Sequence, residues 1–357
     1  MLHAVILAGG SGTRFWPAST RARPKQLLSI APGSNETLIA AAVRRIAPLC
    51  APERILVATG AHLVEATRRE LPGLPPGAFL GEPVPRNTAP CIAWAASLLA
   101  RRDPEATVMV LPSDHHVGDE PAFLAALKIA VRSAERAITT IGITPTSAET
   151  GYGYIESGEE FADGVQSVVR FVEKPDKTRA EEYLAGGRHY WNSGMFFFRA
   201  AALLDAVRRH LPELHAGLER IERAAERGPD AERSETELVF PSLPSISIDY
   251  GIMERESPLH VVRASFGWSD LGSWQSAWEL APKDASGNAA DPNALLVDAR
   301  GNLVRDLRSG EKSRPIAVLG VNDLCVIETE DATLVVPRDR AQDVRMLVEA
   351  LERRHKL

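Results

Sequence analysis

The chain has 357 residues, of which 45% are hydrophobic and 25% charged, a composition that indicates a globular protein with one large and one smaller domain. Its 41 basic and 47 acidic residues give a net charge of −6, so we expect no nucleic-acid binding and no attachment to an anionic membrane. Any phosphate binding must therefore come from a local group of residues.

The sequence has no run of about 18 apolar residues and no basic leader before an apolar segment, which argues against a membrane span or signal peptide. Cys50, Cys91 and Cys325 lie far apart and have no metal-binding spacing. We therefore expect a cytoplasmic protein with reduced thiols.

Short apolar runs alternate with helical patterns in the first half of the chain. The predicted buried strands are residues 4–7, 54–59, 107–111 and 138–143, and the predicted helices are residues 88–102, 121–136 and 199–210. This alternation predicts a parallel α/β sheet covered by helices.

The pattern changes towards the end of the chain. Residues 150–280 are less regular, with a predicted strand at 168–173, and residues 281–292 have the composition of a linker. Short β-like runs then follow at 295–297, 316–319, 324–328 and 333–336, before a terminal amphipathic helix at 340–353. We predict a domain of residues 1–284 and a small β-rich domain of residues 285–357 with a terminal helix.

A glycine-rich loop follows the first strand. It reads Leu7, Ala8, Gly9, Gly10, Ser11, Gly12, Thr13, Arg14, with Lys25 a short distance on. Glycines let the backbone approach a ligand and turn its amides towards an anion. The spacing matches neither G-x-G-x-x-G nor G-x-x-x-x-G-K-[ST], so it disfavours dehydrogenases and P-loop enzymes.

A carboxylate follows the strand at residues 107–111. Asp114 comes after Leu111-Pro112-Ser113, at the sheet edge where open α/β sheets bind their ligands. It is a candidate magnesium ligand, although a capping aspartate is the structural alternative. The neighbouring His115 and His116 cannot both point into one site from regular structure, and we assign them no catalytic role.

The loop, together with Phe15-Trp16-Pro17 and Pro24-Lys25-Gln26, resembles the sugar-phosphate nucleotidyltransferases, in the version found in mannose-1-phosphate guanylyltransferases. The resemblance covers about residues 1–280. It implies a Rossmann-like domain with a mostly parallel mixed sheet and a small β module resembling a left-handed β-helix. It also implies that residues 7–13 bind the nucleotide, that Arg14 and Lys25 are catalytic cations, and that Asp114 and Asp270 together bind one Mg²⁺.

Residues 81–90 resemble the base-binding segment of these enzymes. Guanine presents donors at N1 and N2, and a carboxylate such as Glu82 can accept from both. Asn87 and Thr88 either contact the nucleotide or cap the helix that follows.

Three further segments resemble the acceptor site for the sugar phosphate. Glu173 can accept hydrogen bonds from two hydroxyls, Asn192 can donate and accept, and Gly153 leaves room for the pyranose, while Lys174 can hold the phosphate. Asp249 either orients the sugar or a metal-bound water, or shapes a turn.

The resemblance implies transfer of GMP from GTP to mannose 1-phosphate, giving GDP-mannose and pyrophosphate, by Mg²⁺-assisted in-line attack on the α-phosphate. It also implies a homodimer. Two alternatives stay open: a uridylyl- or thymidylyltransferase acting on glucose 1-phosphate, and a noncatalytic regulatory subunit that senses sugar nucleotides.

Overall fold

The computed structural model describes residues 1–10, 12–31, 35–162, 164–308 and 314–354. The predicted nucleotide-binding residue Ser11 lies outside these ranges. The chain forms two compact units, each built from separate segments. The first unit comprises Met1–Gly9, Ala42–Ser113 and Val117–Trp268, and the second comprises Gly10–Ala41, Asp114–His116 and Ser269–Leu357.

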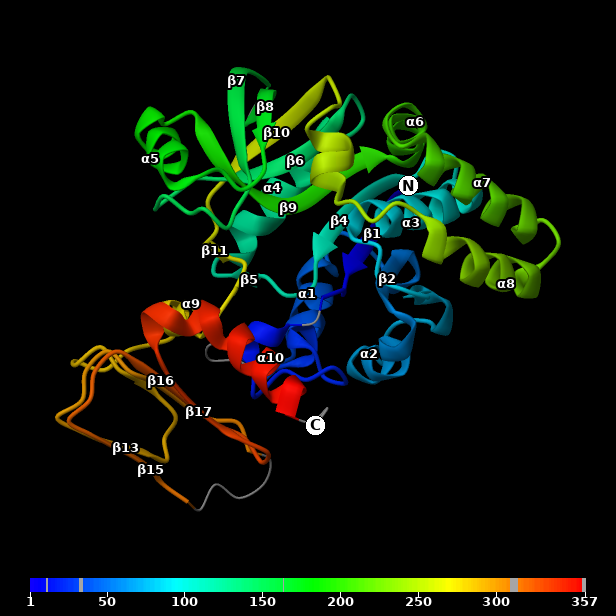
Figure 1. The fold of residues 1–357 in the computed structure, drawn as a ribbon. Coiled ribbons are helices and arrows are strands. Elements are labelled where there is room, and N and C mark those ends of the chain that lie inside the picture. Colours follow the sequence, from blue (N-terminus) through cyan, green and yellow to red (C-terminus); the bar gives the residue numbers. More distant parts are fainter. Residues whose placement is uncertain (11, 32–34, 163, 309–313, 355–357) are drawn as a thin grey trace. The chain divides into compact units, whose positions relative to one another are not determined.

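A mixed sheet forms the centre of the first unit (Figure 1). Within the described residues it has nine strands in the order β3-β2-β1-β4-β9-β6-β10-β8-β7. Their bounds are β1 Leu2–Leu7, β2 Ile55–Gly60, β3 Phe79–Glu82, β4 Thr107–Pro112, β6 Ile138–Ile143, β7 Tyr154–Ala162, β8 Val165–Val172, β9 His189–Arg199 and β10 Leu259–Ala264. The pairings show that β8 and β9 run against the others, so the sheet is mixed but mostly parallel, as predicted.

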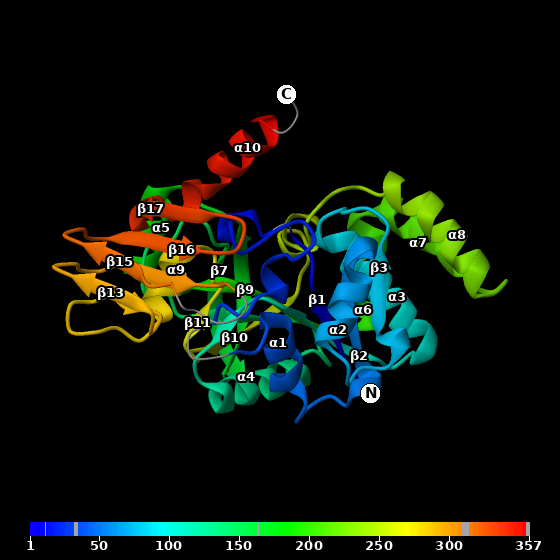
Figure 2. The same cartoon turned by 90° about the horizontal axis from the view of Figure 1, so that it is seen from below.

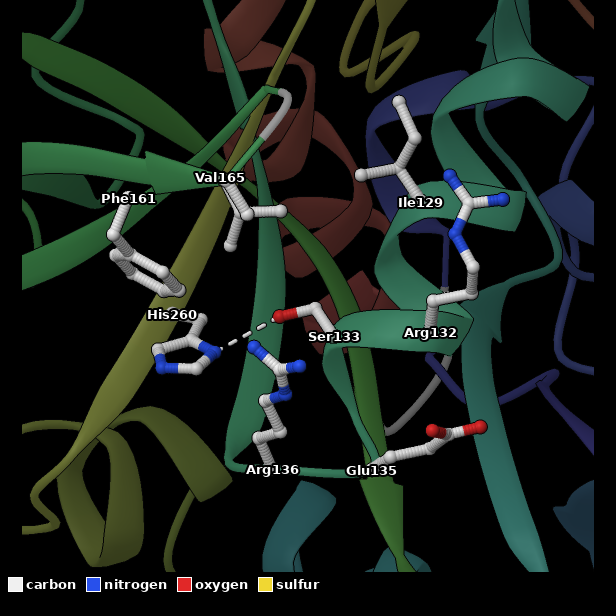
Figure 3. A pocket seen from close by; sticks show the side chains of 9 residues that line it. Ile129, Arg132, Ser133, Glu135, Arg136, Phe161, Val165 and His260 are labelled. Atoms are coloured by element: carbon white, nitrogen blue, oxygen red, sulfur yellow. Dashed lines mark hydrogen bonds between the residues drawn. The ribbon is translucent and has the colours of Figure 1, made fainter.

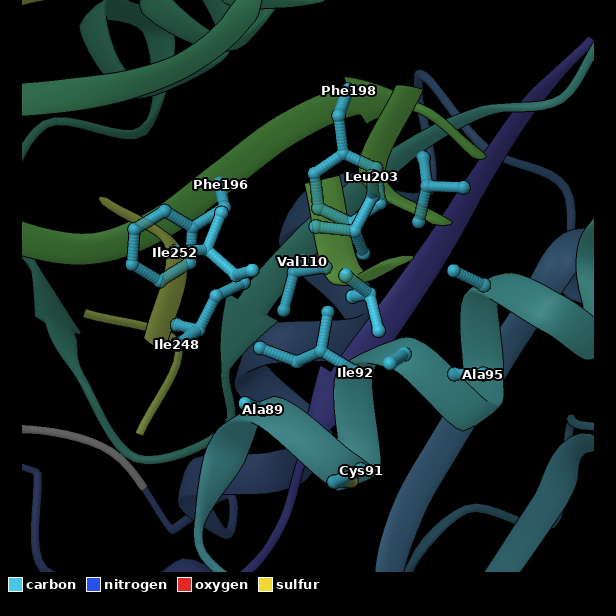
Figure 4. Packing of buried hydrophobic residues seen from close by; sticks show 14 of the residues in the cluster. Ala89, Cys91, Ile92, Ala95, Val110, Phe196, Phe198, Leu203, Ile248 and Ile252 are labelled. Atoms are coloured by element: carbon cyan, nitrogen blue, oxygen red, sulfur yellow. The ribbon is translucent and has the colours of Figure 1, made fainter. Parts of the chain in front are cut away.

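Helices pack against this sheet; α4 contacts its β6, β8, β9 and β10 side, and α3 contacts β1 and β2. The helices with residues in the first unit are α1 Leu38–Ile46, α2 Val64–Glu70, α3 Thr88–Arg102, α4 Glu120–Ser133, α5 Lys177–Gly186, α6 Ala200–His210, α7 Pro212–Ala225 and α8 Pro229–Val239. Figure 4 shows Ile92 of α3 facing Val110 of β4, with Phe196 and Phe198 of β9 closing the same cluster. These side chains are at most 2% exposed, so they form a close-packed apolar core.

The second unit contains a small set of parallel strands (Figure 2). Its strands are β12 Ala289–Ala290, β13 Ala294–Val297, β14 Leu303–Asp306, β15 Ile316–Leu319, β16 Leu324–Glu328 and β17 Thr333–Pro337. β12, β14 and β16 pair in parallel in one sheet, β13 and β15 pair in parallel in another, and β17 closes the first sheet antiparallel to β16. Stacked parallel strands of this kind build a coil, with α9 Trp274–Leu280 before it and α10 Val344–Arg354 after it.

Buried asparagines stabilise the turns of this coil. The Asn302 side chain donates to Asn288 Oδ1 at 3.1 Å and to the Val321 carbonyl at 3.0 Å, and it accepts from the Leu324 amide at 3.0 Å. Asn302 is fully buried, so these bonds satisfy its own side-chain amide, which water cannot reach. An asparagine can do this because its amide both donates and accepts.

Most predicted elements are confirmed. The four strands predicted in the first half, the helices at 88–102 and 199–210, and the late β runs all appear within two residues of the expected bounds. The helix predicted at 121–136 ends at Ser133, and the amphipathic helices α7 and α8 were not predicted. Two-residue strands β5 His116–Val117 and β11 Trp268–Ser269 were also not predicted. The division at 284/285 stays a prediction.

Among the described residues, no helix combines the length and the apolar character that crossing a membrane requires.

We expect Asn302→Leu to loosen the coil, because it leaves the partly buried Leu324 amide and the Val321 carbonyl without their side-chain partners. A loss of about 2 kcal/mol from such unsatisfied groups speeds local amide exchange by roughly 30-fold. Hydrogen-exchange mass spectrometry of peptides covering residues 288–328 measures this. Val335→Thr, at a side chain that is 59% exposed, is the control and should leave exchange unchanged. Equal exchange in Asn302→Leu and wild type would show that the asparagine bonds do not hold the coil.

Candidate functional site

The glycine-rich loop takes backbone conformations that side chains disfavour. Gly10 has φ +104° and Gly12 has φ +57°, both in the left-handed region. A β-carbon at position 12 would also lie 2.7 Å from the Lys25 backbone nitrogen. Only glycine therefore allows the loop to pass so closely over Lys25.

The residues before the loop are held in the sheet of the first unit. The Ala8 amide donates to the Ala58 carbonyl at 2.7 Å, and the Ala8 carbonyl accepts from the Thr59 hydroxyl at 2.9 Å. The Leu7 carbonyl accepts from the Ser113 amide at 3.0 Å. The Ala8 amide is thus engaged by the sheet, while Gly9 has open space around its α-carbon.

Lys25 lies at the centre of a charged cluster in the second unit. Its ammonium donates to Asp114 Oδ2 at 2.8 Å and to the Asp270 backbone carbonyl at 2.6 Å. The Lys25 side chain is only 8% exposed, and its Nζ lies 5.7 Å from the centre of the Phe15 ring. Three predicted catalytic residues, Lys25, Asp114 and Asp270, therefore meet at one point although they are far apart in the sequence.

The Asp114 carboxylate is stabilised in its charged form. Burial acts to raise the pKa of Asp114, but the positive charge of Lys25, together with His115, outweighs it and lowers the pKa below its usual value. The side chain is 31% exposed, so a ligand can reach it. Asp114 therefore remains an anion at neutral pH.

Asp270 lies in a turn with an unusual backbone. Leu271, the next residue, has φ +46°, a conformation that is strained for a leucine, and its amide donates to the Ser269 hydroxyl at 3.0 Å. A β-carbon at Gly272 would lie 2.8 Å from Asp270 Oδ2. The Asp270 carboxylate thus folds back over Gly272, a position that requires a glycine.

The donor chemistry at this cluster fits a divalent cation such as Mg²⁺, which prefers carboxylate oxygens. Among the described residues there is no group of three or more His, Cys, Asp or Glu that could hold a metal alone. Mg²⁺ usually binds to proteins through one or two carboxylates, and substrate phosphates and water supply its other ligands. The two carboxylates of Asp114 and Asp270 are therefore a sufficient protein contribution for this ion.

The three residues that follow Gly12 form a short 3-10 turn, Thr13–Phe15. Arg14 is exposed there, and its guanidinium donates to Gln342 Oε1 at 3.1 Å. A single exposed hydrogen bond of this kind leaves a long side chain able to reorient towards an anionic ligand.

A second polar cluster lies in the first unit. Asn192 Nδ2, on β9, donates to Asp249 Oδ1 at 2.9 Å, and the Asn192 amide donates to the Gly153 carbonyl at 2.8 Å. Glu173 Oε1 pairs with Lys174 Nζ at 2.9 Å. A β-carbon on Gly153 would lie 2.5 Å from Glu173 Oε2, so the structure brings all five predicted sugar-phosphate residues together.

Negative charge accumulates in this cluster. Burial, followed by the charge of Glu173, raises the pKa of Asp249 to about 6. The hydrogen bond from Lys174 to Glu173 raises the pKa of Lys174, which stays cationic. The cluster thus offers several hydroxyl acceptors beside one fixed positive charge.

Backbone irregularities position these residues. Asp249 begins a π-helix, Asp249–Met253, a rare form that often occurs at functional sites. Lys174 has φ +48°, and the Glu173 amide donates to Glu254 Oε1 at 3.2 Å. Sequence reasoning missed Glu254, because nothing in its local pattern indicates a partner 81 residues away.

The predicted base-binding segment has clear local roles. Asn87 precedes α3 at φ 66° and ψ −168°, a region used almost solely by glycine, and its Oδ1 accepts from the Thr88 amide at 2.9 Å. The Thr88 hydroxyl accepts from the Ile248 amide at 2.9 Å. The structure thus shows capping and bracing at Asn87 and Thr88, and contact with a nucleotide stays a prediction.

Glu82, the last residue of β3, interacts with an unexpected side chain, the buried Cys91 on α3. Burial, and then the charge of Glu82, raises the pKa of the Cys91 thiol. Burial also raises the pKa of Glu82 to about 7, and Cys91 offsets only part of this effect. Sequence reasoning treated Cys91 as a packed thiol and missed this contact.

Known proteins resemble the chain over its whole length. A family model described as "Nucleotidyl transferase" matches residues 3–287, and one described as "MannoseP isomerase/GMP-like beta-helix domain" matches residues 292–351. The Xanthan biosynthesis protein XanB of Xanthomonas campestris is 40% identical over 98% of this chain and 73% of its own length.

Two further relatives agree with this match. A mannose-1-phosphate guanylyltransferase of Klebsiella pneumoniae is 38% identical over 99% of this chain and 74% of its own length. A crystal structure from Thermus thermophilus, described as a "mannose-1-phosphate geranyltransferase", superposes with a TM-score of 0.86 at 35% identity, over 98% of this chain and 99% of that one. The chain therefore belongs to the nucleotidyl transferase family, within its mannose-1-phosphate guanylyltransferase group.

Proposed function

We propose that the protein transfers GMP from GTP to mannose 1-phosphate and releases pyrophosphate, so that GDP-mannose is formed. The observation that carries the nucleotidyl transfer is the Lys25 ammonium fixed between Asp114 and the Asp270 carbonyl. The guanylyltransferase relatives at 38% identity support the choice of GTP and mannose 1-phosphate.

The chemistry is an in-line displacement at the α-phosphorus of GTP by a phosphate oxygen of mannose 1-phosphate. No general base is required, because a phosphate monoester with a second pKa of about 6 is largely dianionic at neutral pH. The P–O bond from this oxygen forms as the bond to the β-phosphate oxygen breaks, and pyrophosphate leaves with the electron pair.

The protein stabilises the charge that develops during this transfer. Lys25 has three N–H groups, of which two serve Asp114 and Asp270 in the described structure, and the third can bind a phosphate oxygen. Arg14 and the amides of Gly9, Gly10 and Gly12 supply further positive charge and donors for the leaving pyrophosphate, and Leu7, Ala8, Ser11 and Thr13 complete the nucleotide-binding segment. Fixed cations aimed at developing charge lower the barrier without reorganisation.

Asp114 and Asp270 would hold a divalent cation, which we propose is Mg²⁺. When bound, this ion neutralises phosphate charge and orients the triphosphate. The Lys25 bond holds Asp114 Oδ2 in place.

The polar cluster of the first unit recognises the sugar phosphate. Glu173 and Asn192 bind sugar hydroxyls, Lys174 binds the phosphate, and Asp249 orients Asn192 through their 2.9 Å bond. Gly153 keeps the space in front of Glu173 open.

Glu82 accepts from the N1 and N2 donors of guanine, and Asn87 and Thr88 hold the start of α3 in place beside it.

The test of this function is pyrophosphate release from each of the four NTPs combined with the 1-phosphates of mannose, glucose and N-acetylglucosamine, with Mg²⁺ or EDTA. We expect fast, metal-dependent release with GTP and mannose 1-phosphate. A preference for UTP or dTTP with glucose 1-phosphate would overturn the specificity and keep the chemistry. No release with any pair would indicate a regulatory protein.

We also propose that the protein works in the cytoplasm as a homodimer. Cys50, Cys91 and Cys325 are buried free thiols, which suits a reducing compartment. On α10, Met346 and Leu347 are 59% and 45% exposed, and such apolar side chains are suited to a contact between copies. Light scattering should give twice the 38.7 kDa chain mass, and Leu347→Glu should shift it towards the monomer. A monomeric wild type would contradict the dimer.

Asp114→Asn should lower kcat by about 100- to 1,000-fold, because it removes a charge at the reacting phosphates while preserving side-chain volume. Steady-state pyrophosphate release measures this, and circular dichroism checks the fold. Asp230→Asn, in the first turn of α8, is the matched control and should retain full activity. Near-normal turnover in Asp114→Asn would exclude Asp114 from the catalytic group.

Gly153→Ala should impair use of the sugar phosphate, because its methyl group would lie 2.5 Å from Glu173 Oε2. Such overpacking costs about 1–3 kcal/mol. If this cost falls on the transition state, kcat/KM for mannose 1-phosphate drops roughly tenfold or more, while KM for GTP stays unchanged. Gly151→Ala is the matched control, since nothing lies within 4 Å of its added methyl group. Equal kinetics in the two variants would remove Gly153 from the sugar site.

The raised pKa of Glu82 predicts a pH dependence of GTP use. The carboxyl is protonated below about 7 and charged above it, and only the charged form accepts from both guanine donors. With mannose 1-phosphate saturating, kcat/KM for GTP should therefore fall about tenfold from pH 8 to pH 6. Glu82→Gln should have a lower and flatter profile over this range. An unchanged slope in that variant would assign the titration to another group.

A further inference from the structure

A pocket of about 340 Å³ lies in the first unit, and the proposed reaction does not use its residues. It opens at the end of α4, between the β7–β8 hairpin and β10 (Figure 3). Its lining comprises Ile129, Arg132, Ser133, Glu135, Arg136, Phe161, Ala162, Val165 and His260.

The charged side of the pocket has an excess of positive charge. Arg132 lies in the last turn of α4 and Arg136 in the turn that follows the helix, and Glu135 is the one carboxylate among the described residues of the lining. Within the described ranges of the chain, neither arginine forms an ion pair with a carboxylate. Figure 3 shows the Arg136 guanidinium turned towards Ser133 and His260, with the Glu135 carboxylate on the other side.

The other polar groups of the pocket are already satisfied by one another. Ser133 Oγ and His260 Nδ1 are 2.9 Å apart, and the Thr139 hydroxyl donates to Ser133 Oγ at 2.9 Å. Burial, and then the charge of Arg136, lowers the pKa of His260, which keeps this imidazole neutral at physiological pH. A ligand in this pocket would therefore interact chiefly with the two guanidinium groups, which bind anions.

The opposite side of the pocket is apolar. Phe161 is 50% exposed at the end of β7, and its ring centre lies 4.7 Å from that of His260. Val165 lies near Phe161, and Ile129 adds an apolar side chain from α4 beside Arg132 (Figure 3). An exposed aromatic ring beside apolar side chains gains most when a ligand ring covers it.

We propose that this pocket binds a small organic anion, a phosphate ester or carboxylate that carries one apolar ring. The anionic group contacts Arg132 and Arg136, and the ring packs on Phe161. The pocket volume lies at the lower end of the range for ligand sites, about 300–1,000 Å³, which suits one ring rather than a complete sugar nucleotide. Both arginines are required, because the carbonyls at the end of α4 oppose an anion.

Isothermal titration calorimetry of the full chain with phenyl phosphate, which measures the number of sites and their affinity, tests the proposal. We expect one site, with affinity about tenfold weaker in Arg132→Gln and in Arg136→Gln, since each removes a charge-assisted hydrogen bond. Arg102→Gln is the matched control, because Arg102 occupies the last turn of α3 as Arg132 occupies that of α4. Pyrophosphate release should be unchanged in all three variants, which separates this site from the proposed function.

Two further arms identify the ligand class and the site. Phe161→Ala should weaken phenyl phosphate but not inorganic phosphate, and Lys174→Gln should leave the affinity for phenyl phosphate unchanged. The proposal fails if wild type does not bind, if neither arginine variant weakens binding, or if only Lys174→Gln does. Equal affinity for inorganic and phenyl phosphate, with no effect of Phe161→Ala, would overturn the organic ligand class.

Discussion

A buried ammonium group organises the second unit. Lys25 is almost fully enclosed, and an enclosed charge is stable only when oppositely charged or polar partners surround it. Its partners Asp114 and Asp270 lie 89 and 245 residues away in the chain, so satisfying this one charge draws three distant segments together. The same contact also requires a glycine at position 12, because a side chain there would collide with the Lys25 backbone. The contact that encloses this charge is thus also the one to which we assign the phosphate chemistry.

The polar cluster of the first unit has an excess of negative charge, in contrast to the enclosed cation Lys25 of the second unit. Glu173 and Asp249 are close enough for the charge of one to raise the pKa of the other, and Lys174 compensates only part of this charge. Such a site is under-satisfied until hydroxyl donors enter it, which favours a polyol over an apolar ligand. The π-helix and the left-handed Lys174 hold this arrangement in place at some cost in backbone energy.

Local patterns were sufficient to predict most regular elements, and the resemblance to the nucleotidyltransferases supplied the motif residues that these elements carry. The four early strands are continuous apolar runs, and the glycine loop and Asp114 follow two of them directly. What the sequence could not reveal depends on long-range contacts. Glu254 and Cys91 have unremarkable neighbours, and their partners are set by how β8, β3 and α3 pack. The purpose of Gly153 likewise emerges only when Glu173 is opposite it.

The coil of the second unit has an evolutionary consequence. Its rungs are linked through the pairing of Ala289 with Leu303 and of Leu303 with Cys325, although the stretches between these rungs are unequal in length. Each of these rungs is stabilised by pairing with its neighbours and by the asparagine bonds. Lineages can therefore gain or lose residues between rungs without disturbing the ladder, so divergence in length is expected to accumulate there while Asn288 and Asn302 persist.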